Sequence, residues 1–208
     1  MTLVSPSPGL KFQYGQSEIK YLKRRDPALG QAINKIGIIE RPVIPDLFKA
    51  LVKSVVGQQI SKKAAATVWN RFCVKYPIIT PRGIAHADVA DIQKCGLSMR
   101  KAGYIAGIGE AVVSGDLDIK ALSEMPDDAV IKKLSSIPGV GVWTAEMLLI
   151  FSLCRPDVVS WGDLAIRRGM MVLYGLSRLT KEQFDHYRGR YAPHGSVASL
   201  YLWELSAK

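Results

Sequence analysis

The most specific chemical feature of the chain is a glycine-containing turn at residues 137–141, with the sequence Ile-Pro-Gly-Val-Gly. Gly139 and Gly141 flank an apolar residue, and helical periodicity precedes and follows them. Glycines at this spacing allow a tight turn whose backbone amides point outward at the start of the next helix. Such amides can hold a phosphate without a charged side chain. An ordinary connection between two helices is the alternative for so short a motif.

A second feature is Asp163, which follows Trp161-Gly162 and stands directly before an amphipathic run. This position predicts a helix N-cap, in which the carboxylate accepts hydrogen bonds from the first backbone amides. Capping is compatible with a chemical role, because a carboxylate can also stabilise positive charge or act on a water molecule.

Helices must position these groups, because apolar residues recur at intervals of three and four between glycines and prolines, as in Leu29, Ile33 and Ile36. No run alternates apolar and polar residues over six positions, so the fold is predicted to be all-α. Predicted N-caps are Asp46, Ser61, Ser98 and Asp163. The expected helices are residues 17–24, 27–37, 46–57, 61–76, 80–84, 87–94, 98–114, 118–123, 126–135, 142–153, 163–175, 180–189 and 194–207.

Composition favours a polyanionic partner, because 28 Lys and Arg residues against 18 acidic ones give a formal net charge of +10. A merely soluble basic protein is the alternative. Cys73, Cys95 and Cys154 are too few and too widely spaced for a disulfide framework or a four-cysteine cluster, which indicates a reducing compartment. No stretch of 18 apolar residues occurs, and nothing directs the protein to a membrane.

The segment from Leu134 to Glu146, followed by an aspartate about 20 residues later at Asp163, resembles the helix-hairpin-helix (HhH-GPD) family of DNA glycosylases. The resemblance extends from about Phe12 to Trp203. It implies an enzyme of base excision repair that binds duplex DNA and flips a damaged base into a cleft. It also implies that Asp163 is the catalytic carboxylate, stabilising a sugar with oxocarbenium character as the base departs.

Trp143 indicates the branch of the family. Members that also cut the backbone place a lysine here as an amine nucleophile, so this chain resembles the monofunctional members, which hydrolyse the glycosidic bond without AP-lyase activity. A tryptophan is similar to the 3-methyladenine DNA glycosylase II (AlkA) type, in which it stacks on an electron-deficient alkylpurine. Filling a helix interface is the alternative role. Because few residues precede Phe12, we expect a minimal member that lacks the β-rich N-terminal domain of longer AlkA proteins.

The resemblance also implies further site residues. The base pocket would add Tyr191, Met147, Leu164, Phe12 and Tyr14, with core packing as the alternative for each. The DNA-binding residues would be Gly139, Val140, Gly141 and Thr144 in the hairpin, Gln58 or Gln59 filling the gap left by the flipped base, Leu97 as a second wedge, and Lys62 and Lys101 on phosphates, with Lys63, Arg167 and Arg168 as further candidates. For the two glutamines and Leu97 the alternative is an ordinary polar turn. For the basic residues it is a solvated helix face.

No cofactor is expected, because this chain lacks the four cysteines that hold an iron–sulfur cluster in some relatives. The resemblance implies only a monovalent cation, Na⁺ or K⁺, bound by the backbone carbonyls of Ser135, Ile137 and Val140. We expect a central bundle, 46–150, that ends with the hairpin. A second lobe would comprise 1–45 and 151–208, and the cleft between the lobes would carry Trp143 and Asp163. A monomer is expected, located in the cytoplasm with the nucleoid, or in the nucleus of a eukaryote.

Three rival functions are left open. One is a glycosylase for oxidised guanine or a mismatched base, which the tryptophan and the missing cysteine cluster disfavour. Another is a non-catalytic hairpin module that only binds DNA, which Asp163 disfavours. A helical protein–protein adaptor is the third, and DNA binding that depends on salt would exclude it.

Overall fold

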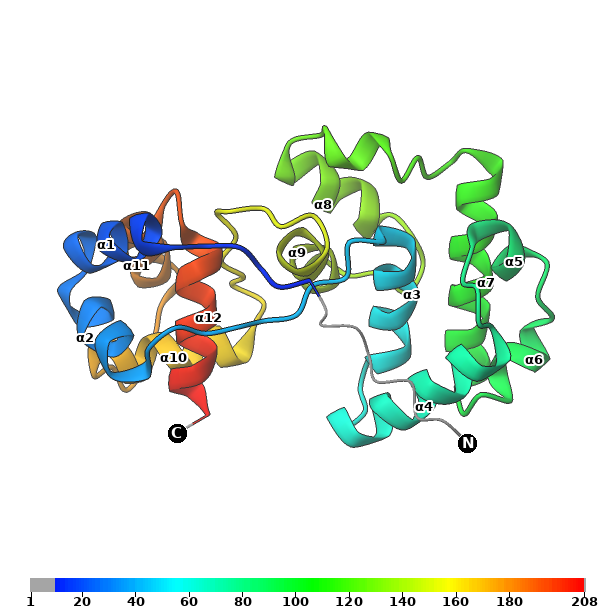
Figure 1. The fold of residues 1–208 in the computed structure, drawn as a ribbon, viewed down its shortest axis with the longest axis horizontal. Helices are drawn as coiled ribbons and strands as arrows, with labels where there is room; N and C mark the ends of the chain where they lie inside the picture. Colours follow the sequence, from blue (N-terminus) through cyan, green and yellow to red (C-terminus); the bar gives the residue numbers. More distant parts are fainter. Residues whose placement is uncertain (1–9, 208) are drawn as a thin grey trace. The chain divides into compact units, whose positions relative to one another are not determined.

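The structure is a computed structural model that describes residues 10–207, and it confirms the all-α prediction (Figure 1). The predicted bounds agree with the observed ones to within two residues, except at 118–123, where only the 3₁₀ helix η1 (Ala121–Ser123) forms. The helices are α1 (Gln16–Arg25), α2 (Pro27–Ile36), α3 (Leu47–Gly57), α4 (Lys62–Lys75), α5 (Pro81–Ala85), α6 (Val89–Gln93), α7 (Met99–Ser114), α8 (Asp127–Ser135), α9 (Val142–Phe151), α10 (Leu164–Tyr174), α11 (Lys181–Tyr191) and α12 (Gly195–Ser206).

Side-chain caps explain why the helices begin where they do. Each of the four predicted N-caps accepts a hydrogen bond from a backbone amide in the first turn of its helix. The pairs are Asp46 with Lys49, Ser61 with Ala64, Ser98 with Lys101, and Asp163 with Ala165 and Ile166. The cap predictions are therefore confirmed.

The chain divides into two compact units, whose boundary falls within α9. Unit 1 consists of Met1–Val43 and Leu149–Lys208, and unit 2 of Ile44–Leu148. In unit 2, α7 packs against α3, α5 and α6. In unit 1, α10 packs on α12 so closely that a Cβ atom on Gly169 would collide with the carbonyl of Leu202. Gly169 therefore sets the separation of these two helices.

A buried polar network joins three helices of unit 1. Asp26 is fully buried at the start of α2, where Oδ1 accepts from the amide of Leu29 (2.9 Å) and Oδ2 accepts from the hydroxyl of Tyr174 (2.6 Å). The hydroxyls of Tyr174 and Tyr191 are 2.7 Å apart. Burial raises the pKa of both tyrosines, so each hydroxyl keeps its proton and can act as a donor.

Replacing Asp26 with alanine is expected to lower the free energy of unfolding by about 3 kcal/mol, because a cap is lost and a buried hydroxyl loses its acceptor. The matched control is Asp46→Ala, which removes the same kind of cap from an exposed position and should cost about 1 kcal/mol. Urea unfolding of both variants measures the difference. Equal losses of unfolding free energy in the two variants would show that the hydrogen bond from Tyr174 adds no stability beyond that of the N-cap.

None of the helices within residues 10–207 is both long enough and apolar enough to cross a membrane.

Candidate functional site

The hairpin between α8 and α9 has the geometry expected of an anion-binding turn. Gly139 has φ of +86°, a left-handed conformation that favours glycine, and the amide of Val140 donates to the carbonyl of Ile137 (3.0 Å). Val140 is buried and anchors the turn, whereas Gly141 and Val142 are exposed at the start of α9. Amides at the beginning of a helix have no acceptor within that helix, and here those of Gly141 and Val142 belong to exposed residues.

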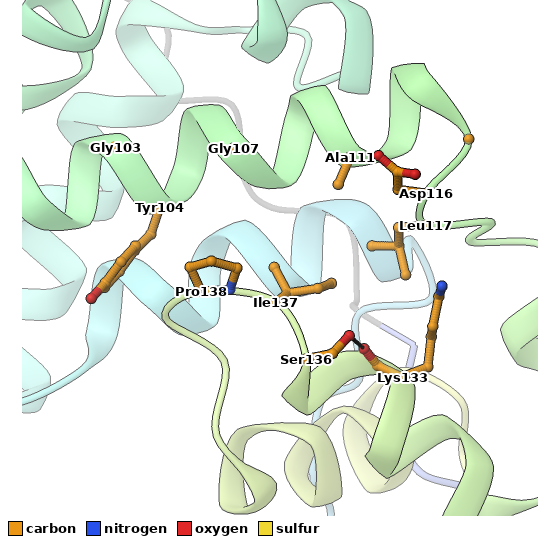
Figure 2. A pocket seen from close by; sticks show the side chains of 11 residues that line it. Gly103, Tyr104, Gly107, Ala111, Asp116, Leu117, Lys133, Ser136, Ile137 and Pro138 are labelled. Atoms are coloured by element: carbon orange, nitrogen blue, oxygen red, sulfur yellow. Dashed lines mark hydrogen bonds between the residues drawn. The ribbon is translucent and has the colours of Figure 1, made fainter.

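A cavity of about 580 Å³ in unit 2 lies between α7 and the segment from Lys133 to Pro138 that leads into the hairpin (Figure 2). Gly103, Tyr104 and Gly107 of α7 line this cavity together with Ile137 and Pro138 of the hairpin, so the aromatic ring of Tyr104 stands between two glycines on the helix face that the hairpin approaches. A Cβ atom on Gly139 would collide with the ring of Tyr104, which extends from the same helix. Glycine is thus required at position 139 for a second reason, the close approach of the Tyr104 ring, which the sequence spacing alone does not reveal.

A separate cavity of about 700 Å³ brings seven of the predicted residues of unit 2 together. The indole of Trp143 is 46% exposed, which leaves an aromatic surface open toward this space. Thr144 lies along the same cavity although it is only 4% exposed. The lining residues are Lys53, Ser54, Gly57, Gln58, Gln59, Ile60, Gly139, Gly141, Trp143, Thr144 and Met147. Lys53, Ser54, Gly57 and Ile60 were not predicted as site residues, because nothing in their types distinguishes them from other helix and turn residues.

The turn between α3 and α4 is fixed to the hairpin. The side-chain amide of Gln58 donates to the carbonyl of Gly139 (2.9 Å), although 81 residues separate them. Gln59 has φ of +55°, which is rare for a residue other than glycine, and both Gln59 and Ile60 are exposed. Gln58 is therefore bound to the hairpin, and Gln59 is the glutamine that is exposed on the turn.

Two predicted DNA contacts have other roles in the structure. The ammonium group of Lys101 donates to the carbonyls of Val56 (3.1 Å) and Gln58, and burial lowers its pKa. Lys101 therefore caps the end of α3 rather than reaching for a phosphate. Leu97 is only 7% exposed, so it packs inside unit 2 rather than projecting as a wedge. Lys62 is exposed at the first position of α4.

Asp163 is held from two sides in unit 1. Its Oδ1 atom accepts from the amides of Ala165 (2.8 Å) and Ile166 (3.0 Å), and its Oδ2 atom accepts from the indole nitrogen of Trp203 (3.2 Å). The side chain is 7% exposed. These bonds leave the carboxylate one orientation, which is the property that a group acting on a nearby sugar needs.

One face of α12 supports the segment that leads to Asp163. The hydroxyl of Ser196 accepts from the amide of Val158 (3.0 Å) and donates to the carbonyl of Arg155 (2.6 Å). The hydroxyl of Ser199 donates to the carbonyl of Val158 (2.9 Å). Ser196, Ser199 and Trp203 follow one another at intervals of three and four, so they share a helix face. Trp203 had no predicted role, because its link to Asp163 is purely spatial.

The remaining pocket candidates in unit 1 differ in exposure. Leu164 is 51% exposed at the first position of α10, next to Asp163. Tyr191 is fully buried in the Asp26 network, and Phe12 is 6% exposed beside the bridge between Lys11 and Pro42. The hydroxyl of Tyr14 donates to the carbonyl of Ile39. Interior positions favour packing over base stacking for Tyr191 and Phe12. The cleft predicted between the two lobes stays a prediction.

Comparison with known proteins identifies the family of this chain. Residues 52–193 match the family model of the HhH-GPD superfamily base excision DNA repair protein. DNA-3-methyladenine glycosylase 1 of Schizosaccharomyces pombe is 37% identical over 166 residues, which cover 76% of this chain and 72% of that protein.

Two solved structures share the fold. The crystal structure of a DNA-3-methyladenine glycosidase from Bacillus halodurans superposes with a TM-score of 0.82 at 35% identity, covering 96% of this chain and 92% of that one. The 3-methyladenine DNA glycosylase Mag1 of S. pombe, in complex with abasic DNA, gives 0.78 at 32% identity, covering 90% and 95%. With the family match over more than half of its length, this chain belongs to the HhH-GPD superfamily of base excision DNA repair proteins.

Proposed function

We propose that this protein is a monofunctional DNA glycosylase that removes alkylated purines such as 3-methyladenine from duplex DNA. The observation that carries the proposal is the half-exposed indole of Trp143 in a cavity of about 700 Å³ beside the hairpin. Relatives named for 3-methyladenine support the choice of base. An indole face attracts a ring that carries positive charge, which is the property of these alkylated purines.

Binding would begin at the hairpin, where the amides of Gly141 and Val142 meet a phosphate of the damaged strand. The exposed turn at Gln59 and Ile60 would enter the space left by the flipped nucleotide. Unstacking costs a few kcal/mol and is least for damaged, weakly paired bases, so part of the selectivity precedes chemistry.

Asp163 would supply the chemistry. Its carboxylate stabilises the positive charge that develops on the sugar as the bond from the anomeric carbon to the base breaks. It also orients a water molecule, whose oxygen bonds to that carbon while its proton is taken up by the carboxylate. The products are the free base and an abasic site. The bonds from Ala165, Ile166 and Trp203 keep the carboxylate in place throughout.

The family resemblance implies a monovalent cation at the hairpin, and one observation fits it. The hydroxyl of Ser135 is buried and has no hydrogen-bond partner within the described residues. The carbonyls of Ser135, Ile137 and Val140 would hold the ion, since a carbonyl that already accepts one hydrogen bond keeps a second lone pair. The ion would add positive charge beneath the bound phosphate.

The proposal is tested by incubating the protein with methylated duplex DNA and measuring both released bases and strand breaks. We expect free 3-methyladenine, and strand breaks only after alkali treatment. No release despite salt-sensitive binding to the same DNA would leave a hairpin module that only binds, and would overturn the proposal.

The strand-break assay also tests the absence of lyase activity, because one amine, Lys53, does line the cavity with Trp143. Its Nζ atom lies 5.6 Å from the centre of the Trp69 ring. Breaks without alkali that disappear in Lys53→Gln would show a Schiff-base route through this lysine and contradict the monofunctional assignment. We expect Lys53→Gln and the native protein to give equally few breaks.

A further inference from the structure

The segment from residue 47 to residue 87 has an unusual charge pattern. It contains seven basic residues and no aspartate or glutamate, so it supplies much of the net charge of +10. The basic residues are Lys49, Lys53, Lys62, Lys63, Arg71, Lys75 and Arg82. All of them are exposed, and none except Lys75 has an ion pair among the described residues.

Five of these residues gather around α4, on its two sides. Lys63 and Arg71 lie along one side with Ser61 and Thr67, in a shallow hollow of about 420 Å³. Lys53 and Lys62 line a second hollow of about 440 Å³ on the other side. We call Lys49, Lys53, Lys62, Lys63 and Arg71 the α4 basic surface.

Lys49 belongs to this surface because it stands four residues before Lys53 on α3, so the two lysines share a helix face. Burial raises the pKa of the Cys73 thiol on α4, and the ammonium groups of Lys49 and Lys53 on α3 oppose that rise. The surface ends near the last turn of α4, where Lys75 pairs with Asp91 at 3.0 Å. Asp91 thus neutralises the cation at this end of α4.

The position of this surface relative to the hairpin indicates which part of DNA it meets. Gln58 ties the α3–α4 turn to the carbonyl of Gly139, and α4 begins directly after that turn. The turn therefore connects the hairpin to α4 within unit 2; Lys63 and Arg71 do not line the hairpin cavity, whereas Lys53 lines it as well as the hollow beside α4. If the hairpin holds the damaged strand and the turn enters the duplex, α4 lies on the far side of the turn.

We propose that the α4 basic surface binds the phosphates of the undamaged complementary strand. The inference rests on the proposed function, because it takes the hairpin to hold the damaged strand. Lys63 and Arg71 are eight residues apart on one helix face, about 12 Å along the axis. That distance spans about three nucleotides of one strand. The surface would hold the complementary strand while the damaged nucleotide is flipped out. Because single-stranded DNA has no complementary strand, the surface would favour binding of duplex DNA.

The test is to measure binding of the double variant Lys63→Gln with Arg71→Gln to a stable abasic analogue, placed either in a duplex or in the same strand alone. Loss of two phosphate contacts is expected to lower the slope of log affinity against log salt by about 2 for the duplex. Affinity for the single strand should change less than twofold. A charge-retaining variant, Lys63→Arg with Arg71→Lys, should keep the native slope.

The matched control removes one lysine and one arginine elsewhere, by Lys20→Gln with Arg24→Gln on α1, and should leave the slope unchanged. Equal effects of the two double variants would show that only net charge matters and would overturn the proposal. A loss for the single strand as large as for the duplex would place the surface on the damaged strand and overturn it as well. No base is released in these assays, so failure here is distinguishable from failure of the glycosylase assignment.

Discussion

Replacing Asp163 with asparagine is expected to lower the rate of base release at least about 100-fold, because the negative charge that stabilises the sugar is lost. Asparagine is also a good N-cap, so α10 should still begin at residue 164. Its side-chain nitrogen would then face the indole N–H of Trp203, and two donors cannot bond to each other. We therefore expect a destabilisation of about 1 kcal/mol as well.

Single-turnover base release from methylated duplex DNA measures this effect, with thermal unfolding recorded for the same samples. Asp46→Asn is the matched control, because it changes an exposed N-cap on α3 and should leave the rate unchanged. Binding to DNA with an abasic analogue should survive in Asp163→Asn. Base release at the native rate would remove Asp163 from the mechanism.

The second large effect is expected from Trp203→Phe, which keeps an aromatic ring on α12 but removes the donor to Asp163. A hydrogen bond to a charged acceptor is worth about 1.5–3 kcal/mol, so the rate of base release should fall about tenfold or more if the bond positions the carboxylate. Affinity for the abasic analogue should stay within twofold, because Trp203 reaches the reaction only through Asp163. The effect is thus on the chemical step and not on binding.

Phe151→Leu provides the control for Trp203, because the two rings are neighbours in unit 1, with centroids 5.5 Å apart. This change disturbs the same packing and leaves the indole N–H in place. If both variants lose activity in proportion to their melting temperatures, Trp203 is a packing residue. A tenfold loss confined to Trp203→Phe identifies it as the positioning residue for Asp163.

Local patterns were sufficient to predict the helices and their caps. Intervals of three and four between apolar residues, together with Asp46, Ser61, Ser98 and Asp163, predict helices whose bounds the structure reproduces closely. The exception is 118–123, where the apolar pattern is only one turn long and yields a 3₁₀ helix. Short segments lack the cooperative bonds that define a regular helix, so their form depends on what they pack against.

The hairpin and Asp163 are features that the sequence determined by itself, because a positive φ at Gly139 and an N-cap at Asp163 depend on residues within a few positions. Only the tertiary structure decided which groups restrain them. Gln58 binds the carbonyl of Gly139 and Trp203 binds Asp163 across 81 and 40 residues. The physical reason is that a cap or a turn is a local energy minimum of the backbone, whereas a contact between distant side chains exists only after helices have packed.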